Sequence, residues 1–180
     1  MAKILVIDDE RAIRNTLKEI LEFEGYTVEV AENGRIGLER ALSNAFDLIF
    51  TDIKMPEMDG MEFLHAYRSA CAQQGAEEAP VVMITGHGSV DNAVEALKSG
   101  AFDFIQKPLD LNRLLLTTKH ALEHKSLVKE TKVLRKKISK RYQMIGESAA
   151  IARVRATIDN VAATEARVLI TGANGTGKEV

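Results

Sequence analysis

Five short apolar runs, separated by stretches whose apolar residues recur at helical spacing, fill the first 110 residues of this 180-residue chain. Runs of consecutive apolar side chains are typical of strands buried on both faces of a parallel sheet, and the intervening pattern is typical of the helices that cover it. The expected strands are Lys3–Ile7, Tyr26–Ala31, Asp47–Asp52, Val81–Thr85 and Phe102–Gln106. The expected helices cover residues 13–24, 36–42, 61–71 and 90–99. We therefore predict an α/β fold with one doubly wound, five-stranded parallel sheet.

Charge is distributed unevenly along the chain, although the total is only −2. Residues 1–124 carry 12 basic and 21 acidic side chains, a net charge of −9. Residues 125–145 carry eight basic and one acidic side chain, a net charge of +7, and residues 146–180 carry four of each. This division predicts an acidic domain, a basic connector and a third segment, and the total argues against a globally basic nucleic-acid-binding protein.

Two further features of the sequence argue against a disulfide-bonded, zinc-binding, secreted or membrane-spanning protein. Cys71 is the only cysteine, which excludes an internal disulfide bond and argues against a cysteine-based zinc site. No apolar run approaches the ~18–20 residues of a membrane span, and the short run after Met1 ends in two carboxylates, unlike a secretory signal. We expect a cytoplasmic protein with no membrane partner.

Residues 111–143 contain neither glycine nor proline, which predicts one long helix. Six of the residues from 127 onward fall at alternating spacings of four and three, the pattern of a heptad seam. They are Leu127, Thr131, Leu134, Ile138, Arg141 and Ile145. The seam predicts a short dimeric coiled coil, and the alternative is a solvated basic helix that only connects domains.

Polar side chains follow four of the five expected strands at the point where each strand ends. Asp8 and Asp9 follow the first strand, Asp52 ends the third, Thr85 ends the fourth and Lys107 follows the fifth. Ligands of open parallel sheets bind at this edge. Converging carboxylates repel one another unless a cation such as Mg²⁺ lies between them, and a lysine beside them is suited to phosphate. Because aspartate can act as a nucleophile toward phosphorus, the set predicts a Mg²⁺-dependent phosphoacceptor.

Residues 1 to about 122 resemble the receiver domain of two-component response regulators. The resemblance rests on Ile7-Asp8-Asp9-Glu10, on Thr51-Asp52 with Lys54-Met55-Pro56, on Met58-Asp59-Gly60, on Thr85-Gly86 and on Phe104-Ile105-Gln106-Lys107-Pro108. It implies a flavodoxin-like fold with strand order 2-1-3-4-5. It also implies that a sensor histidine kinase phosphorylates this domain.

The same resemblance implies a role for each matching residue. Asp52 is the expected phosphoacceptor, and Lys107 is expected to pair with the phosphoryl group. The implied Mg²⁺ ligands are Asp8, Asp9, Asp52 and the backbone carbonyl of Lys54. Thr85 and Phe104 are the implied switch pair, with Phe104 acting through packing alone, and Lys107–Pro108 is the implied cis peptide.

A second motif lies near residue 180. The stretch Gly172, Ala173, Asn174, Gly175, Thr176, Gly177, Lys178 and Glu179 follows an expected buried strand, Val168–Thr171, as a phosphate-binding P-loop does. With Ile145-Gly146-Glu147-Ser148, it resembles the start of the AAA+ ATPase domain of NtrC-type activators of sigma-54 polymerase. Ala173 and Asn174 depart from the usual Glu-Ser pair of that P-loop, and Glu179 stands where P-loops in general carry Ser or Thr.

These features predict three parts: a receiver domain over 1–122, a linker helix over 123–145 and an incomplete AAA+ segment over 146–180. We expect the chain to be a piece of a longer regulator, a homodimer through the receiver and linker helix. ATP, sigma-54 RNA polymerase and DNA are then ligands of the full-length protein only, and ATP hydrolysis by this chain is not expected.

The leading hypothesis is a phosphorylation-activated response regulator whose switch controls a sigma-54-dependent ATPase. An alternative is a phosphorylation-independent dimerisation module with a vestigial acidic pocket. A third candidate is a nucleotide-hydrolysing enzyme centred on Lys178. Phosphorylation of Asp52 distinguishes the first from the second, and ATP binding tests the third.

Overall fold

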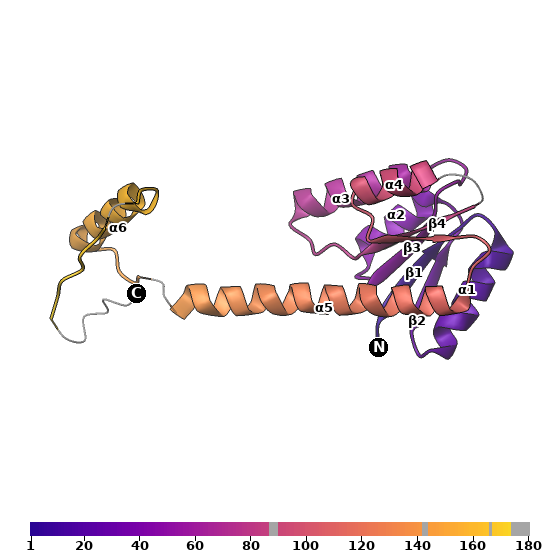
Figure 1. Cartoon of the computed structure of the whole chain (residues 1–180), viewed down its shortest axis with the longest axis horizontal. Coiled ribbons are helices and arrows are strands. Elements are labelled where there is room, and N and C mark those ends of the chain that lie inside the picture. Colours follow the sequence, from indigo (N-terminus) through magenta and orange to yellow (C-terminus); the bar gives the residue numbers. More distant parts are fainter. Residues whose placement is uncertain (87–89, 142–143, 166, 174–180) are drawn as a thin grey trace. The chain divides into compact units, whose positions relative to one another are not determined.

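A computed structural model describes residues 1–86, 90–141, 144–165 and 167–173. The chain divides into two compact units, Met1–Val128 and Lys129–Val180. The first unit is built on a five-stranded, all-parallel sheet of order β2-β1-β3-β4-β5 (Figure 1). Its strands are β1 (Lys3–Ile7), β2 (Thr27–Ala31), β3 (Leu48–Asp52), β4 (Val81–Thr85) and β5 (Asp103–Gln106). The predicted fold class and strand order are confirmed.

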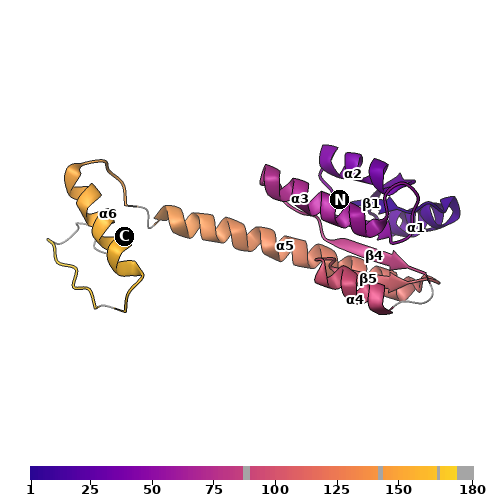
Figure 2. The same ribbon diagram turned by 90° about the horizontal axis from the view of Figure 1, so that it is seen from above.

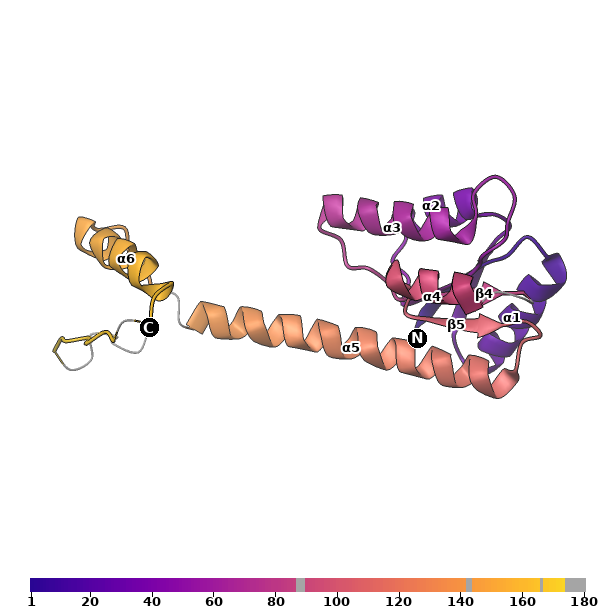
Figure 3. The same ribbon diagram turned by 45° about the horizontal axis from the view of Figure 1, so that its top comes forward.

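The helices of the first unit cover both faces of this sheet (Figures 1 and 3). They are α1 (Arg11–Phe23), α2 (Gly34–Ser43), α3 (Gly60–Gln74), α4 (Val90–Lys98) and the first part of α5 (Leu111–Arg141), a helix that continues past the end of the unit at Val128. Side chains of α2, α3 and α4 form one apolar core with the sheet, and those of α1 and α5 form the other. Along β1, Leu5 and Ile7 enter the first core while Ile4 and Val6 enter the second, as the two-residue period of a strand requires.

Local sequence explains where several helices begin and end. The Asp59 carboxylate accepts a hydrogen bond from Glu62 N at 2.8 Å, and the Glu62 carboxylate accepts one from Asp59 N at 3.0 Å, a capping box that starts α3. Gly100 follows α4 with a φ of +98°, a conformation that glycine adopts without strain. The Lys107–Pro108 peptide is cis, as the resemblance implied.

The long helix predicted over 111–143 is confirmed as α5, which runs to Arg141; residues 142 and 143 lie outside the described part. Figure 2, seen from above, shows α4 and α5 beside the β4–β5 edge. Within the proposed seam, Leu127 and Leu134 are 63% and 50% exposed. The side chains of Ile138 and Arg141 are also outside the described part, so the coiled coil stays a prediction.

The second unit differs from the prediction at two places. Val168–Thr171 is not a strand, and Val168, Leu169 and Ile170 are 62%, 86% and 63% exposed rather than buried. A strand forms only where a neighbouring strand bonds its backbone, and no described residue supplies that neighbour here. A helix that we did not predict, α6 (Ala149–Ala162), begins at Ser148, whose hydroxyl accepts a hydrogen bond from Ile151 N at 3.3 Å.

The described part of the chain has no helix that is both long enough and apolar enough to cross a membrane.

Candidate phosphoacceptor site

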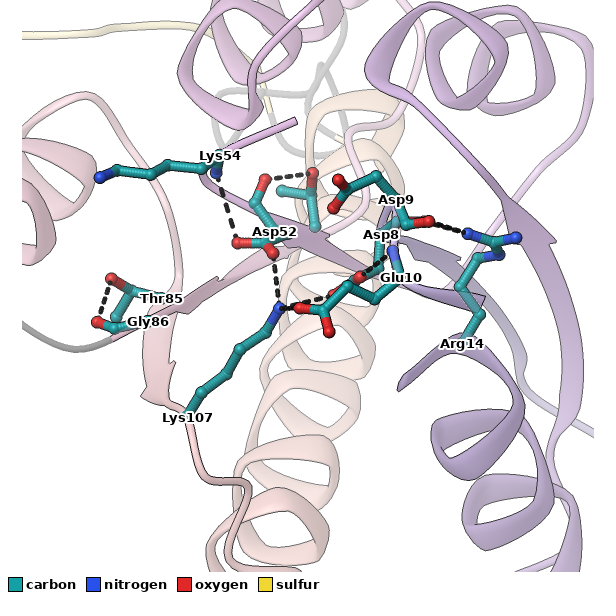
Figure 4. Close-up of polar contacts among 10 residues, drawn as sticks. Asp8, Asp9, Glu10, Arg14, Asp52, Lys54, Thr85, Gly86 and Lys107 are labelled. Atoms are coloured by element: carbon teal, nitrogen blue, oxygen red, sulfur yellow. Dashed lines mark hydrogen bonds and ion pairs between the residues drawn. The ribbon is translucent and has the colours of Figure 1, made fainter. Parts of the chain in front are cut away.

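The carboxyl ends of three strands bring together the three most buried charged groups predicted for the site (Figure 4). Lys107 Nζ lies 2.6 Å from Asp52 Oδ2 and 3.1 Å from Asp8 Oδ2. The side chains of Asp8, Asp52 and Lys107 are 0%, 8% and 15% exposed. β1 and β4 both pair with β3, so the sheet order itself places Asp8 next to Asp52.

Asp8 occupies the deepest position in this cluster. Its Oδ1 accepts a hydrogen bond from Glu10 N at 2.8 Å. Its Oδ2 is fully buried and, beyond the ion pair with Lys107, accepts no hydrogen bond from any residue that the structure describes. Burial raises the pKa of Asp8, and the Glu10 amide and Lys107 only partly oppose that effect. A buried carboxylate oxygen with this unused capacity is the donor that a hard cation requires.

Lys107 balances the negative charge of the cluster. Burial by itself would lower its pKa, but the hydrogen bond to Asp52, the close contact with Asp8 and the negative charges of both carboxylates raise the pKa above its usual value. Lys107 is therefore protonated throughout the physiological pH range. It can offer its positive charge to any anionic group that approaches Asp52.

Glu10 belongs to the cluster, although the sequence did not single it out as a ligand. Its Oε1 lies 3.1 Å from Lys107 Nζ, and one carboxylate oxygen from each of Asp8, Glu10 and Asp52 lies within 4.8 Å of the others. The only sequence signal was its position next to Asp8 and Asp9. Glu10 is the residue before α1 and its carboxylate makes no capping bond, which leaves the side chain available to Lys107.

Asp9 and Lys54 flank the cluster. Asp9 is exposed and, with Lys54, lines an open pocket of about 570 Å³ whose other walls include Pro56 and Met61. The backbone N–H of Lys54 donates to Asp52 Oδ1 at 3.3 Å. Asp9 thus lies at the rim of the site in this structure, while Asp8 and Asp52 form its floor.

The backbone around Asp52 depends on a glycine. A Cβ placed on Gly60, the first residue of α3, would overlap the backbone oxygen of Asp52. Gly60 N also donates to Ile53 O at 2.9 Å. The absence of a side chain at position 60 lets α3 start directly above the loop that follows Asp52.

The implied switch residues occupy the expected strands. Thr85 ends β4, is 8% exposed and donates from Oγ1 to Gly86 O at 3.2 Å. Phe104 lies on β5, is partly buried and packs against the core formed by α2, α3 and α4. Their coupled movement stays a prediction.

Comparisons with known proteins agree with this geometry. The family described as "Response regulator receiver domain" matches residues 4–119. The chain belongs to this receiver family. A second family, described as "Sigma-54 interaction domain", matches residues 144–180.

Full-length relatives extend the similarity across both matches. The nitrogen assimilation regulatory protein NtrX of Azorhizobium caulinodans is 40% identical over 179 residues, and the transcriptional regulatory protein ZraR of Escherichia coli K12 is 39% identical over 178. Each alignment covers 98% of this chain but only 38% of the relative. The receiver and the segment after it therefore correspond to somewhat more than a third of such regulators.

Solved structures show the same relationship. NtrX from Brucella abortus in complex with ATP has a TM-score of 0.68 and 38% identity, over 99% of this chain and 38% of that one. A response regulator receiver domain protein from Clostridium thermocellum has a TM-score of 0.62 and 36% identity, over 71% of this chain and 99% of that one. The receiver fold thus matches a complete receiver protein, and the whole chain matches part of an NtrX.

The predicted P-loop falls almost entirely outside the described residues. Gly172 and Ala173 are described, whereas Asn174, Gly175, Thr176, Gly177, Lys178 and Glu179 are not. Its role rests on the sequence and on the family match over residues 144–180.

Proposed function

We propose that this chain is the phosphoacceptor and linker part of a phosphorylation-activated two-component regulator that acts on sigma-54-dependent transcription. The observation that carries the proposal is the buried contact between Lys107 Nζ and Asp52 Oδ2, 2.6 Å long, inside a cluster of carboxylates. A nucleophile at the end of a strand, with a fixed cation beside it, is what in-line phosphoryl transfer requires of a protein.

In the proposed reaction, a carboxylate oxygen of Asp52 forms a bond to phosphorus as the phosphorus–nitrogen bond of a phosphohistidine breaks. The electron pair of that bond returns to the imidazole nitrogen of the sensor kinase, and Asp52 becomes an acyl phosphate. Lys107 stays protonated and holds the transferred group by its charge. Thr85 lies at the end of the neighbouring strand, from which its hydroxyl can donate to a phosphoryl oxygen.

The acidic residues of the site fit a Mg²⁺ ion. Asp8, Asp9, Asp52 and the backbone carbonyl of Lys54 are the ligands that we propose, and Asp8 supplies the buried oxygen without a hydrogen bond. Bound Mg²⁺ would neutralise charge on the transferring phosphoryl group. When no metal ion is bound, the positive charge of Lys107 compensates the negative charges of Asp8, Glu10 and Asp52.

We further propose three functional parts, 1–122 as the receiver, 123–145 as a dimerising linker helix and 146–180 as the start of an AAA+ domain. The match to the sigma-54 interaction domain supports the last part. In the full-length protein, the loop from Gly172 to Glu179 would bind ATP, and the ATPase would act on sigma-54 RNA polymerase at DNA. The sensor histidine kinase is the proposed partner of the receiver.

The test is phosphorylation of the chain by acetyl phosphate in the presence of MgCl₂, followed by intact mass. We expect a gain of one phosphate in the wild-type protein and in a Glu19→Gln control, whose exposed carboxylate lies on α1 away from the cluster. Asp52→Asn should show no gain. A wild-type protein that gains nothing, or an Asp52→Asn variant that still gains a phosphate, overturns the proposal.

A second measurement separates a switch from a constitutive dimerisation module. Beryllium fluoride, which takes the place of a phosphoryl group on Asp52, should change the sedimentation profile of the wild-type protein but not that of Asp52→Asn. An unchanged wild-type profile would favour the module with a vestigial pocket.

A further inference from the structure

Arg14, near the start of α1, binds the backbone of the turn formed by Asp8 and Asp9. One guanidinium nitrogen, Nη1, donates to the carbonyl oxygen of Asp8 at 2.7 Å and to that of Asp9 at 2.8 Å (Figure 4). Both bonds have a charged donor, which makes them stronger than bonds between neutral groups. Two consecutive peptide groups are therefore fixed by a single side chain.

The two aspartates differ in what else holds them. The Asp8 carboxylate is fixed by Glu10 N at 2.8 Å and by Lys107 Nζ at 3.1 Å. The Asp9 carboxylate is exposed and has no ion pair or side-chain hydrogen bond with any described residue. Its direction depends on the backbone of the turn, which Arg14 holds in place.

We infer that Arg14 is a positioning residue for the metal site, which orients the Asp8–Asp9 turn so that both carboxylates can reach one divalent cation. The inference rests on the proposed function, because it presumes that Mg²⁺ binds at this turn. Groups that orient metal ligands through hydrogen bonds contribute strongly to metal affinity in other proteins.

Because Arg14 is positively charged, the direction in which its substitution changes Mg²⁺ affinity distinguishes a positioning role from a purely electrostatic one. A cation close to a Mg²⁺ site repels the metal, so the loss of an arginine should by itself tighten Mg²⁺ binding. The loss of the two carbonyl bonds should instead weaken it. Only a positioning role predicts that removal of a positive charge lowers the affinity for a positive ion.

The chain offers a matched control for this test. Arg11 lies one turn earlier on α1, is exposed and makes no ion pair or side-chain hydrogen bond with a described residue. Arg11→Met and Arg14→Met each remove one positive charge from the start of the same helix. The two variants differ in the bonds to the carbonyls of Asp8 and Asp9.

The experiment is a MgCl₂ titration of the unphosphorylated proteins, followed through the amide NMR shifts of residues 8–10. We expect Arg14→Met to weaken Mg²⁺ binding about tenfold, the lower end of the range for residues that orient metal ligands. Arg11→Met should bind Mg²⁺ as tightly as the wild-type protein or more tightly. An Arg14→Met variant that matches the Arg11→Met variant overturns the inference.

The following outcomes separate a failure of the inference from misfolding of the variant and from a failure of the proposed function. If Arg14→Met does not fold by circular dichroism, Arg14→Gln replaces it, and unchanged or tighter Mg²⁺ binding by that variant overturns the inference. If the wild-type protein itself shows no saturable Mg²⁺ shift, the proposed function fails. If only Arg14 proves dispensable, the proposed function stands.

Discussion

Lys107 donates a 2.6 Å hydrogen bond to Asp52, 55 residues earlier in the chain, and both side chains are almost completely buried. The bond joins the end of β3 to the loop after β5, with β4 between them in the sheet. Asp8 and Glu10 share the same ammonium group at 3.1 Å each. One buried cation therefore compensates three carboxylates, and its removal affects both the stability and the chemistry of the site.

Replacement of Lys107 by methionine should destabilise the metal-free protein by about 3 kcal/mol, because buried carboxylates lose their only close cation among the described residues. The folded-state pKa of Lys107 is raised. Its contribution is therefore complete below the unfolded pKa of about 10.4 and is lost only as pH rises through the folded value. Urea unfolding from pH 6 to pH 9 should show a constant difference from the wild-type protein.

Lys119→Met is the control, because the Lys119 side chain is 69% exposed and its ion pair with Glu123 is 4.0 Å long. Its effect should be too small to measure. Added MgCl₂ should recover part of the stability of Lys107→Met. Equal effects of the two lysine variants would contradict this account of the cluster.

Asp8→Asn should stabilise the metal-free protein while it abolishes Mg²⁺ binding. Burial raises the folded-state pKa of Asp8 above its ordinary value of 3.8, so the ionised carboxylate is less stable in the folded protein than in the unfolded chain. The neutral amide removes that penalty, and a gain of about 1 kcal/mol is typical when a strained functional site is relieved. Urea unfolding without metal measures the gain.

The pH dependence of that gain follows from the sign of the pKa shift. As pH falls through the raised pKa, the wild-type Asp8 binds a proton and becomes neutral in the folded state. The advantage of Asp8→Asn over the wild-type protein should therefore shrink at acid pH. An advantage that grows as the solution is acidified would show that the ionised Asp8 is not the source of the penalty.

The floor of the site could be predicted from sequence because it follows from one geometric rule. Asp8 follows β1, Asp52 ends β3 and Lys107 follows β5, and parallel strands present their carboxyl ends at one edge of the sheet. The bounds predicted for Lys3–Ile7 and Val81–Thr85 match β1 and β4. Glu10 could not be assigned in this way, because the direction of a side chain before a helix depends on the turn.

Contacts between segments far apart in the chain were the hardest features to predict from the sequence. Lys125 bonds to residues that precede it by 78 and 79 positions, and nothing local distinguishes it from its basic neighbours. Helix α6 did leave a signal, since Ser148 is a good N-cap and Ile151, Val154 and Ile158 fall at helical spacing. Its apolar face is largely exposed among the described residues, so packing could not have confirmed it.

Asp9 and Glu10 make different contributions to Mg²⁺ binding in our proposal. Each substitution, Asp9→Asn or Glu10→Gln, removes one negative charge from the same turn, so any difference between them reports direct coordination. We expect Asp9→Asn to weaken Mg²⁺ binding at least tenfold and Glu10→Gln about twofold. Titration by amide NMR shifts distinguishes them, and the reverse order would make Glu10, which joins Asp8 and Asp52 in the metal-free cluster, the ligand.

Gly100→Ala should destabilise the first unit more than Gly25→Ala does. Both glycines have a left-handed φ, +98° and +86°, which costs an alanine ~1–2 kcal/mol. A Cβ on Gly100 would also overlap Nη1 of Arg68, which donates to Ser99 O at 2.7 Å, whereas a Cβ on Gly25 would meet no atom of the described residues within 4 Å.

Because both variants share the cost of the left-handed φ, the difference between Gly100→Ala and Gly25→Ala measures the contact between Arg68 on α3 and the end of α4. Loss of the Arg68 bond should add about 1 kcal/mol to the cost of Gly100→Ala in urea unfolding. In the double variant Arg68→Ala/Gly100→Ala the two costs should not add, because they remove the same bond. Full additivity would mean that Arg68 moves aside without loss.

Lys125 lies in the segment that composition marks as a basic connector, yet its side chain is only 16% exposed. Its Nζ donates to Phe46 O at 2.6 Å and to Asp47 Oδ1 at 2.9 Å, before the start of β3. These bonds attach α5 to the amino-terminal edge of the sheet, beyond the end of the predicted receiver at residue 122. We expect Lys125→Met to destabilise the first unit by about 2 kcal/mol, because Phe46 O and the carboxylate of Asp47 each lose a charged donor.

Lys129→Met removes the same charge one turn further along α5, from an exposed side chain outside the first unit. Its effect should stay within about 0.5 kcal/mol. Hydrogen exchange of the amides at residues 121–128 should accelerate in Lys125→Met and remain at the wild-type rate in Lys129→Met, because only the first variant releases the helix from the sheet. Equal exchange rates in the two variants would show that apolar packing alone, through residues such as Leu114 and Ala121, holds α5 in place.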